Sequence, residues 1–516
     1  MLMVSTDSSV KKLYDEMLAG AKELLVLQSA AGIVSWDMET KMPPRGLSLR
    51  SQQLALLGVI GHKMLADPKN EKLLDAIEKD PGYASLDQVQ RRNVYLSRKA
   101  YNEEAKLPEQ LVFETERQRT IAVGVWKKAK AAKDYSMFKP DLEKMIELRK
   151  KAADILMEVK GTKTPYDALI DAFEPKMTAD RISKVFSGMR EGLISVLKKI
   201  EASGFMPDKS LITRPVPIDV QRKISDAAMD FIGYDTKSPN AGGRLDETEH
   251  PFTTGYYDDV RITTHYHEDR WVSSLFSVMH EGGHGIYDQN YPHKWMYQPI
   301  GASASYGIHE SQSRFVENMV GRSPEFLSYM LPRLKKIVGK PLRGVKHGDF
   351  VAAVNAVEPS KIRIEADEVT YGLHIIIRFE IESDIFAGKL TVDELPEVWN
   401  KKYKDYLGVE VENDSEGIMQ DTHWASGLYG YFPSYALGNL YDGMFLKKLR
   451  RDVPDWKKQI KMGNFQPVKS WMIENIHSNG DLYDPAELIK VVCGESLNTK
   501  PFLSYLDKKY SKIYGY

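Results

Sequence analysis

The amino-acid sequence predicts a mainly α protein with one small β-sheet. Through most of the first 205 residues, and again in the segments around residues 272–284 and 308–320, apolar side chains recur at the spacing that places them on one face of an α-helix. One stretch between residues 210 and 270 instead alternates β-favouring and polar residues. A chain of this length can bury a large core, and we expect residues 1–516 to form a single helical domain.

The amino-terminal pattern predicts one helix or a pair of helices over residues 8–34 and a further helix over 49–57. The segment Met42-Pro43-Pro44-Arg45-Gly46 separates them, because proline cannot donate a main-chain hydrogen bond inside a helix. Trp36 lies just before this break. We interpret it as a packed core aromatic and not as a substrate contact.

Helices also follow one another between residues 66 and 205. Turn signals such as Asp80-Pro81-Gly82 separate them. Charges of both signs are spread along these segments, and we interpret them as solvated outer faces. The predicted helical segments are 73–77, 86–103, 108–133, 135–159 and 179–203.

A strand is predicted where the pattern changes. Residues 259–267 alternate in the way expected of a strand with two unlike faces, whereas residues 242–246 are expected to form a loop. We therefore predict a small sheet near residues 250–268. An edge of such a sheet could bind an extended peptide, or the strands could form a purely structural hairpin, and the sequence favours neither.

Composition excludes several classes of protein and site. The 71 Lys and Arg residues balance 72 Asp and Glu residues, so no global field recruits nucleic acid or an anionic membrane. The single cysteine, Cys493, excludes an internal disulfide framework and a cysteine-based metal site. Residues 1–7 lack the start of a signal peptide, and no later segment approaches 18 uninterrupted apolar residues. We expect a cytoplasmic protein.

The most distinctive motif is the HExxH pentapeptide that runs from His280 to His284. It follows a predicted helix start near residues 269–271 and the apolar positions of that helix. Two histidines four residues apart lie roughly 5–6 Å from each other on one helix face, so both imidazoles can bind one metal ion. Glu281 lies about a quarter turn away. Its carboxylate suits the general base of a zinc peptidase.

Three glycines lower the stability of this helix. Gly282, Gly283 and Gly285 each cost about 0.8–1 kcal/mol relative to alanine in a helix interior. Metal coordination could offset that cost, and positions without side chains let another backbone approach closely. We predict that the helix continues through His284.

A metal site that keeps one position open for water needs a third protein ligand. Glu310 supplies it in our interpretation, because it lies 26 residues past His284 in a segment with an apolar face. Glu317 is the alternative, two turns further along the same face.

These motifs resemble the carboxypeptidase Taq family of HExxH metallocarboxypeptidases, and the resemblance extends over nearly the full length. The segment from Trp36 to Gly46 is similar to the amino-terminal segment of the family. Six further segments resemble family motifs in family order: His250-Pro251-Phe252, Asp259-Val260-Arg261-Ile262-Thr263, His280-Glu281-Gly282-Gly283-His284, His309-Glu310-Ser311-Gln312, Ile362-Arg363-Ile364-Glu365-Ala366-Asp367 and Gly417-Ile418-Met419-Gln420-Asp421-Thr422-His423-Trp424.

The resemblance implies His280, His284 and Glu310 as ligands of one divalent ion, zinc or cobalt, and Glu281 as general base. It further implies a helical fold with a deep central groove, which two lobes would flank. The implied enzyme is a cytoplasmic homodimer that releases single residues from peptides with a free terminal carboxylate. Neither nucleic acid nor membrane is an expected partner.

Two further roles need residues. A tetrahedral oxyanion needs a neutral hydrogen-bond donor opposite the metal, and His423 and Tyr435 are the candidates, with Tyr431 less favoured. The terminal carboxylate of a substrate suits a bidentate guanidinium. Arg363 is the first candidate and Arg261 the second, although Arg363 could equally form a structural ion pair.

Acidic residues that follow Arg363 in the sequence, Glu365, Asp367 and Glu368, could orient its guanidinium.

Two functions other than that of a carboxypeptidase remain open. The same motif serves oligopeptidases that cut within short peptides, and a helical interaction protein could keep a degenerate metal site.

Overall fold

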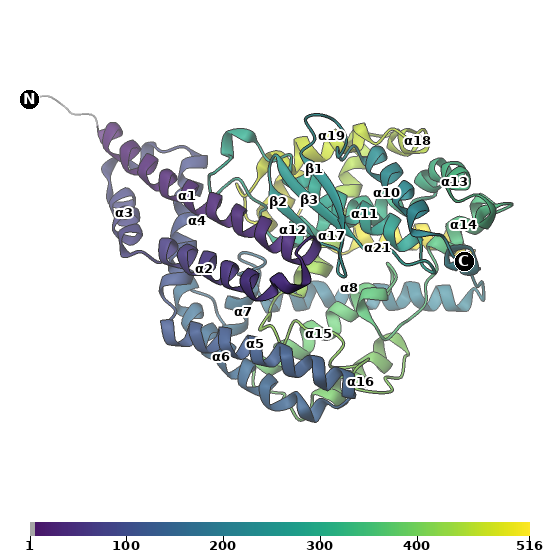
Figure 1. Cartoon of the computed structure of the whole chain (residues 1–516), viewed down its shortest axis with the longest axis horizontal. Helices are drawn as coiled ribbons and strands as arrows, with labels where there is room; N and C mark the ends of the chain where they lie inside the picture. Colours follow the sequence, from purple (N-terminus) through teal and green to yellow (C-terminus); the bar gives the residue numbers. More distant parts are fainter. Residues whose placement is uncertain (1–5) are drawn as a thin grey trace, which may run out of the picture. The chain divides into compact units, whose positions relative to one another are not determined.

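The computed structural model describes residues 6–516 (Figure 1). Helices account for 68% of the chain, and the described residues contain one sheet of three strands, so the predicted mainly α class is confirmed. Part of the segment on which the absence of a signal peptide was predicted, residues 1–5, lies outside the described residues.

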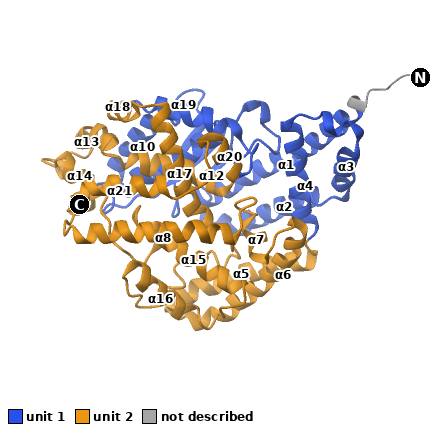
Figure 2. Cartoon of the chain, turned by 180° about the vertical axis from the view of Figure 1, so that it is seen from behind, with its two compact units in different colours: residues 1–106, 216–304, 464–484 blue, residues 107–215, 305–463, 485–516 orange. Residues whose placement is uncertain are grey.

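The chain divides into two compact units, each assembled from segments that are distant in sequence (Figure 2). Unit 1 consists of Met1–Lys106, Val216–Ala304 and Asn464–Asp484. Unit 2 consists of Leu107–Pro215, Ser305–Gly463 and Pro485–Tyr516. The single domain and the central groove that we expected remain predictions.

Unit 1 begins with one long helix, α1, where the pattern predicted one helix or two. Trp36 in α1 is 5% exposed, which agrees with the predicted core role. The helices of unit 1 are α1 (Thr6–Thr40), α2 (Leu47–Leu65), α3 (Pro68–Lys79), α4 (Gln88–Ala105), α10 (Ile218–Ile232), α11 (Val272–Asp288) and α19 (Gln466–Asn475).

The sheet of unit 1 comprises β1 (Gly243–Glu247), β2 (Thr253–Tyr256) and β3 (Asp259–Thr264), with β3 in the centre. β1 is parallel to β3 and β2 is antiparallel to it. The predicted sheet is present, but the loop predicted at residues 242–246 is wrong. Residues 243–246 belong to β1 because the main chain of β3 supplies partners for this segment, beginning with the Val260 N–H that donates to the Gly242 carbonyl at 2.9 Å.

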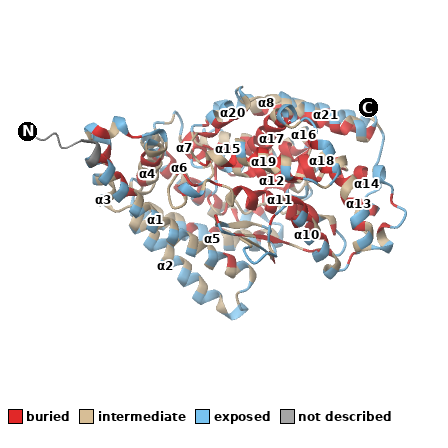
Figure 3. Cartoon of the chain, turned by 90° about the horizontal axis from the view of Figure 1, so that it is seen from above, coloured by how far each residue is buried: buried red, intermediate tan, exposed pale blue. Residues whose placement is uncertain are grey.

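Unit 2 is built from helices. At its centre α17 is mostly buried and packs along α12 (Figure 3). Its helices are α5 (Glu109–Ala132), α6 (Lys139–Lys160), α7 (Pro165–Ile170), α8 (Ala179–Ala202), α9 (Ser210–Thr213), α12 (Tyr306–Arg314), α13 (Pro324–Val338), α14 (His347–Val354), α15 (Tyr371–Phe386), α16 (Leu395–Leu407), α17 (Pro433–Asp452), α18 (Trp456–Lys461), α20 (Pro485–Cys493) and α21 (Lys500–Tyr514).

A π-helical turn, Phe315–Gly321, continues α12 directly. Such turns widen the backbone locally and occur frequently at functional sites. Glu317, the alternative third ligand, lies in this turn. Its carboxylate is 3.1 Å from Arg322 and 3.8 Å from Arg314.

One helix among the described residues is long and apolar enough to cross a membrane by length and composition alone. It is Ser9–Thr40 within α1, and its best window has a mean hydropathy of 1.4 with 6% of it buried. Core helices and signal sequences satisfy the same criterion. The expected absence of a membrane partner therefore remains a prediction.

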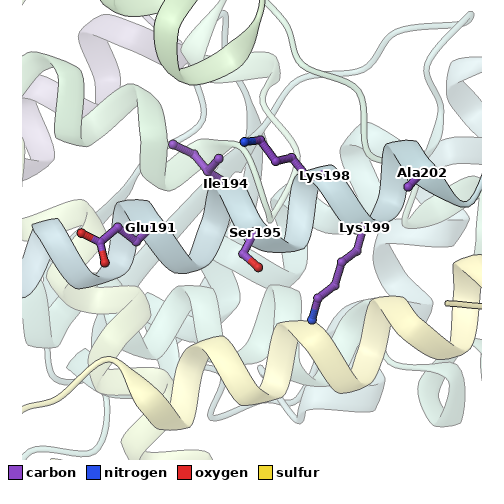
Figure 4. Close-up of a pocket in the computed structure, with 6 residues that line it drawn as sticks. All are labelled: Glu191, Ile194, Ser195, Lys198, Lys199 and Ala202. Carbon is purple, nitrogen blue, oxygen red and sulfur yellow. The ribbon is translucent and has the colours of Figure 1, made fainter.

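An open pocket lies on the outer face of α8 (Figure 4). Its lining contains neither histidine nor cysteine, and Lys199 pairs there with Asp507 of α21 at 2.8 Å. The lining residues are Glu191, Ile194, Ser195, Lys198, Lys199 and Ala202, none of which belongs to a motif of the sequence.

Candidate active site

The pentapeptide lies in α11, which runs from Val272 to Asp288. The helix therefore starts near the predicted position and continues beyond His284, as predicted. Most of its residues are buried, including Glu281 and His284. The segment is helical in spite of its three glycines, so other contacts must offset their low helix propensity.

Close packing against α11 accounts for two of these glycines. A Cβ on Gly282 would lie 2.3 Å from Cδ1 of Ile232 in α10. A Cβ on Gly285 would lie 2.7 Å from the Tyr234 ring and 3.3 Å from Ile262 in β3. A Cβ at either position would force the Ile232 or Tyr234 side chain to shift, so these side chains lie this close to α11 only because it carries glycine there. The packing gained in return stabilises the helix independently of a metal.

The two histidines lie on one face of α11, with ring centroids 5.0 Å apart. Glu310 of α12 completes a group of three. His280, His284 and Glu310 each offer one ligand atom, and these atoms lie within 4.8 Å of one another. Glu317 does not belong to this group. The structure thus brings together the three residues that we preferred as ligands.

This donor set fits a divalent ion. Two imidazole nitrogens and one carboxylate form the protein part of open zinc sites, which keep a further position for water or substrate. Glu310 is held in place by Arg314, whose Nε lies 3.2 Å from its carboxylate. The Arg314 guanidinium in turn stacks 3.8 Å above the Tyr371 ring.

The position of α12 depends on a buried carboxylate that sequence reasoning missed. Glu174 is fully buried and accepts hydrogen bonds from the hydroxyls of Ser305 and Tyr441 and from the Gly307 N–H. Burial raises the pKa of Glu174 to about 7. These contacts join the first turn of α12 to α17, one turn before Glu310. No motif in the sequence marks Glu174.

α17 also approaches α12 closely at a glycine. A Cβ on Gly438 would lie 3.1 Å from the Gly307 carbonyl oxygen and 3.2 Å from Cγ of Glu310. Any larger residue there would push against the side chain of the proposed third ligand. The Glu310 side chain is therefore packed from the side of α17.

Glu281 is 6% exposed, and its carboxylate accepts a hydrogen bond from a threonine. Oγ1 of Thr253, at the start of β2, lies 2.6 Å from Oε2 of Glu281 and 3.1 Å from its carbonyl oxygen. Sequence reasoning missed Thr253, although it directly follows the His250-Pro251-Phe252 motif.

His423 lies in the loop that precedes α17, between two aromatic rings. Its imidazole stacks 5.7 Å from the Tyr431 ring and meets the Phe432 ring at 4.7 Å. Desolvation, and then the nearby Arg378 guanidinium, lower the pKa of His423 to about 3. At neutral pH the imidazole is therefore uncharged, as a neutral hydrogen-bond donor must be.

The two candidate tyrosines are neighbours. The Tyr435 hydroxyl donates to the Tyr431 hydroxyl at 3.2 Å. Burial raises the pKa of Tyr431 to about 12 and that of Tyr435 well above its usual value. Both phenols therefore keep their protons at neutral pH. The structure places His423, Tyr431 and Tyr435 together through ring contacts.

Arg363 is buried and oriented by a residue that we did not predict. Its Nε and Nη2 lie 3.0 and 3.1 Å from the two carboxylate oxygens of Asp421. Two of the acidic residues expected to orient it serve elsewhere, because Asp367 caps the following backbone and Glu368 binds Lys509 at 2.6 Å. The prediction is wrong for these two residues.

Asp421 also binds a second buried guanidinium. Nη1 of Arg378, a residue that is 1% exposed, lies 3.0 Å from Oδ2 of Asp421. The Arg378 guanidinium stacks on Trp424 and Phe432 at 4.3 and 4.2 Å. Two cations that share one carboxylate hold the pKa of Asp421 below its usual range despite its burial. The three groups together carry one net positive charge.

Arg261, the second carboxylate-binding candidate, lies on β3 in unit 1. Its Nε and Nη2 each lie 2.8 Å from a carboxylate oxygen of Asp259, two residues earlier. The guanidinium also stacks 4.4 Å from the Trp36 ring. These contacts occupy the guanidinium of Arg261 within unit 1 and favour a structural role for this residue.

Comparison with known proteins identifies the family. Residues 16–510 match the model of the carboxypeptidase Taq (M32) metallopeptidases. The chain belongs to this family. It is therefore a metallocarboxypeptidase, and its substrates are peptides.

Curated relatives cover almost the whole of this metallocarboxypeptidase. It is 38% identical over 509 residues to thermostable carboxypeptidase 1 of Thermus thermophilus, covering 97% of this chain and 99% of the relative. It is also 38% identical over 494 residues to carboxypeptidase 1 of Bacillus subtilis, covering 96% of this chain and 97% of the relative.

Solved structures of the family agree with the fold. The M32 carboxypeptidase of Deinococcus radiodurans superposes with a TM-score of 0.93 at 31% identity, over 98% of this chain and all of the other. The Pyrococcus furiosus carboxypeptidase superposes with a TM-score of 0.92 at 33% identity, over 96% of this chain and 99% of the other.

Proposed function

We propose that this metallocarboxypeptidase releases single residues from the free carboxyl end of peptides, with Glu281 as general base beside an ion held by His280, His284 and Glu310. The observation that supports this most is that the ligand atoms of His280, His284 and Glu310 lie within 4.8 Å of one another. Glu281, which is buried, directly follows His280 on α11. When bound, a divalent ion there lowers the pKa of water and polarises a carbonyl group.

Zinc is the ion that we propose, with cobalt as the alternative. Two imidazoles and one carboxylate suit both, because their affinity order and preferred geometries overlap. Metal analysis of the purified enzyme by mass spectrometry measures the occupancy of each directly.

Glu281 would accept the proton of the attacking water and pass it to the leaving amine. Its burial makes the transfer sensitive to geometry, since no bulk water replaces a misplaced carboxylate. The oxyanion of the tetrahedral intermediate would receive hydrogen bonds from His423 and Tyr435. Both groups are neutral at neutral pH, which is supported by the low pKa of His423 and the raised pKa of Tyr435.

Arg363 would bind the terminal carboxylate of the peptide, with Arg261 as the second candidate. The net positive charge of Arg363, Arg378 and Asp421 supports this role, because a buried cluster of this sign favours an anion. Asp421 keeps the Arg363 fork in one orientation. A pre-oriented guanidinium loses little entropy on binding a carboxylate.

Replacing Arg363 with alanine should lower kcat/KM on free-carboxylate peptides by about 10²–10³-fold, the usual effect of truncating one partner of a buried charged pair. Bound metal should be unchanged. Steady-state kinetics and metal analysis check both. Arg261→Ala serves as the matched control and should retain activity. A loss confined to Arg261→Ala would transfer the role to that residue.

The alternative is an oligopeptidase that cuts within short peptides, since the same ligand set serves both activities. A synthetic peptide with a free carboxyl end and its amidated twin distinguish the two. A carboxypeptidase should shorten only the free peptide, one residue at a time. Internal cleavage of both twins at equal rates would show that the proposed function is wrong.

The enzyme is proposed to be a cytoplasmic homodimer. Apolar side chains exposed on α2 support an association surface, because monomers rarely leave so many together in water. They are Leu47, Leu49, Leu56, Val59 and Ile60, between 39% and 63% exposed. Light scattering measures the assembly. The single cysteine suits a reducing compartment, which cell fractionation tests.

A further inference from the structure

We propose that Thr253 is a positioning residue that holds the carboxylate of Glu281 in its reactive orientation. The inference rests on the proposed role of Glu281 as general base. It assigns a function to a side chain that is neither a metal ligand nor part of the pentapeptide.

The hydrogen bond between the two residues is short and direct. The 2.6 Å separation of Oγ1 of Thr253 and Oε2 of Glu281 is typical of a hydroxyl that donates to an ionised carboxylate. The same hydroxyl lies 3.1 Å from the Glu281 carbonyl oxygen. A hydroxyl has one proton to donate, and the carboxylate offers both the shorter distance and the charge.

The donor stands on a rigid element. Thr253 begins β2, whose register pairs it with Ile262 of β3. β2 lies so close to β3 that a Cβ on Gly255 would be 2.1 Å from the Asp259 carbonyl oxygen. Both strands contact α11, which carries Glu281. The β-branched side chain of threonine adds stiffness, because it strongly favours few χ1 values.

A general base on a flexible side chain needs such a partner. Glu281 has three rotatable side-chain bonds, and fixing a side chain of this kind has a substantial entropic cost. A hydrogen bond from a strand that is already ordered fixes the Glu281 side chain when the protein folds. The entropic cost is therefore not added to the barrier of the reaction. The carboxylate plane is then set before the substrate binds, which is where correct orientation contributes to rate.

The test compares three single substitutions. Thr253→Val keeps the shape and the β-branch but removes the hydroxyl, and it should lower kcat by about 10- to 100-fold, with KM and bound metal unchanged within about twofold. Thr253→Ser restores the donor and should recover most of kcat. Thr254→Val is the matched control at the next position of the same strand, on its opposite face, and should leave kcat unchanged.

A fourth variant separates this inference from the proposed function. In a Glu281→Gln background, Thr253→Val should change the residual rate less than twofold, because no carboxylate is left to position. The positioning role is wrong if Thr253→Val alone leaves kcat unchanged while Glu281→Gln abolishes it. It is equally wrong if Thr253→Ser fails to recover activity in folded protein, or if Thr253→Val acts through lost metal or a raised KM. Near-normal activity in Glu281→Gln would instead contradict the proposed function itself.

Discussion

Replacing Glu281 with glutamine should lower kcat by about 10²–10⁴-fold, the usual contribution of a general base, while metal content and melting temperature stay unchanged. Glutamine has the same shape, and its amide oxygen can still accept the hydrogen bond of Thr253. It cannot accept a proton at neutral pH. The proposed ligands, His280, His284 and Glu310, are left intact, so only proton transfer should suffer.

Kinetics on a free-carboxylate peptide, together with metal analysis of the same sample, checks this expectation. Glu268→Gln is a suitable control because Glu268 is an exposed acid just ahead of the same helix. If Glu281→Gln kept more than a tenth of the wild-type rate, a different group would have to take the proton.

Replacing His280 with alanine should remove the metal and lower the melting temperature towards that of chelated wild-type enzyme. Only two of the proposed metal ligands, His284 and Glu310, remain in this variant. A ligand that binds only the folded state stabilises that state by about 2.7 kcal/mol when its concentration is a hundred times its dissociation constant. That stabilisation is lost with the site. The fold itself should persist, since the packing of Ile232 and Tyr234 against the glycines of α11 does not depend on a metal.

Thermal unfolding of the wild type and the variant, each with and without chelator, measures this effect. His293→Ala, at an exposed histidine of the same unit, provides the control. Chelator should lower the melting temperature of the wild type and of the control but not that of His280→Ala. If the melting temperature of His280→Ala equalled that of the metal-loaded wild type, a stabilising role for the ion would be refuted.

The sequence predicted most of the helices before residue 205 and the core of the site, because both depend on local patterns. Helical periodicity is visible within one segment, and the spacing of His280 and His284 already places two imidazoles on one face. Glu310 was harder to choose, since Glu317 lies on the same face. The structure distinguishes them, because the ligand atoms of His280, His284 and Glu310 lie within 4.8 Å of one another, whereas the Glu317 carboxylate lies outside this group and pairs with Arg322 at 3.1 Å.

The missed residues act through contacts that are distant in sequence. Thr253 looks like an ordinary strand residue until β2 is placed against α11. Arg378 lies 43 residues from Asp421 in a helix whose neighbours are apolar, and Glu174 lies 131 residues from Ser305. β1 was predicted as a loop for the same reason, because its partner strand, and not its own composition, makes it a strand.

The most direct test of the central claim is a mass spectrum of the paired peptides, one with a free carboxyl end and one amidated, after incubation with the enzyme with and without chelator. We expect a ladder of products shortened one residue at a time from the free carboxyl end, no ladder from the amidated twin, and neither product after chelation. Internal fragments from both peptides, or a ladder that chelation leaves intact, would contradict a metal-dependent carboxypeptidase with its catalytic centre on α11.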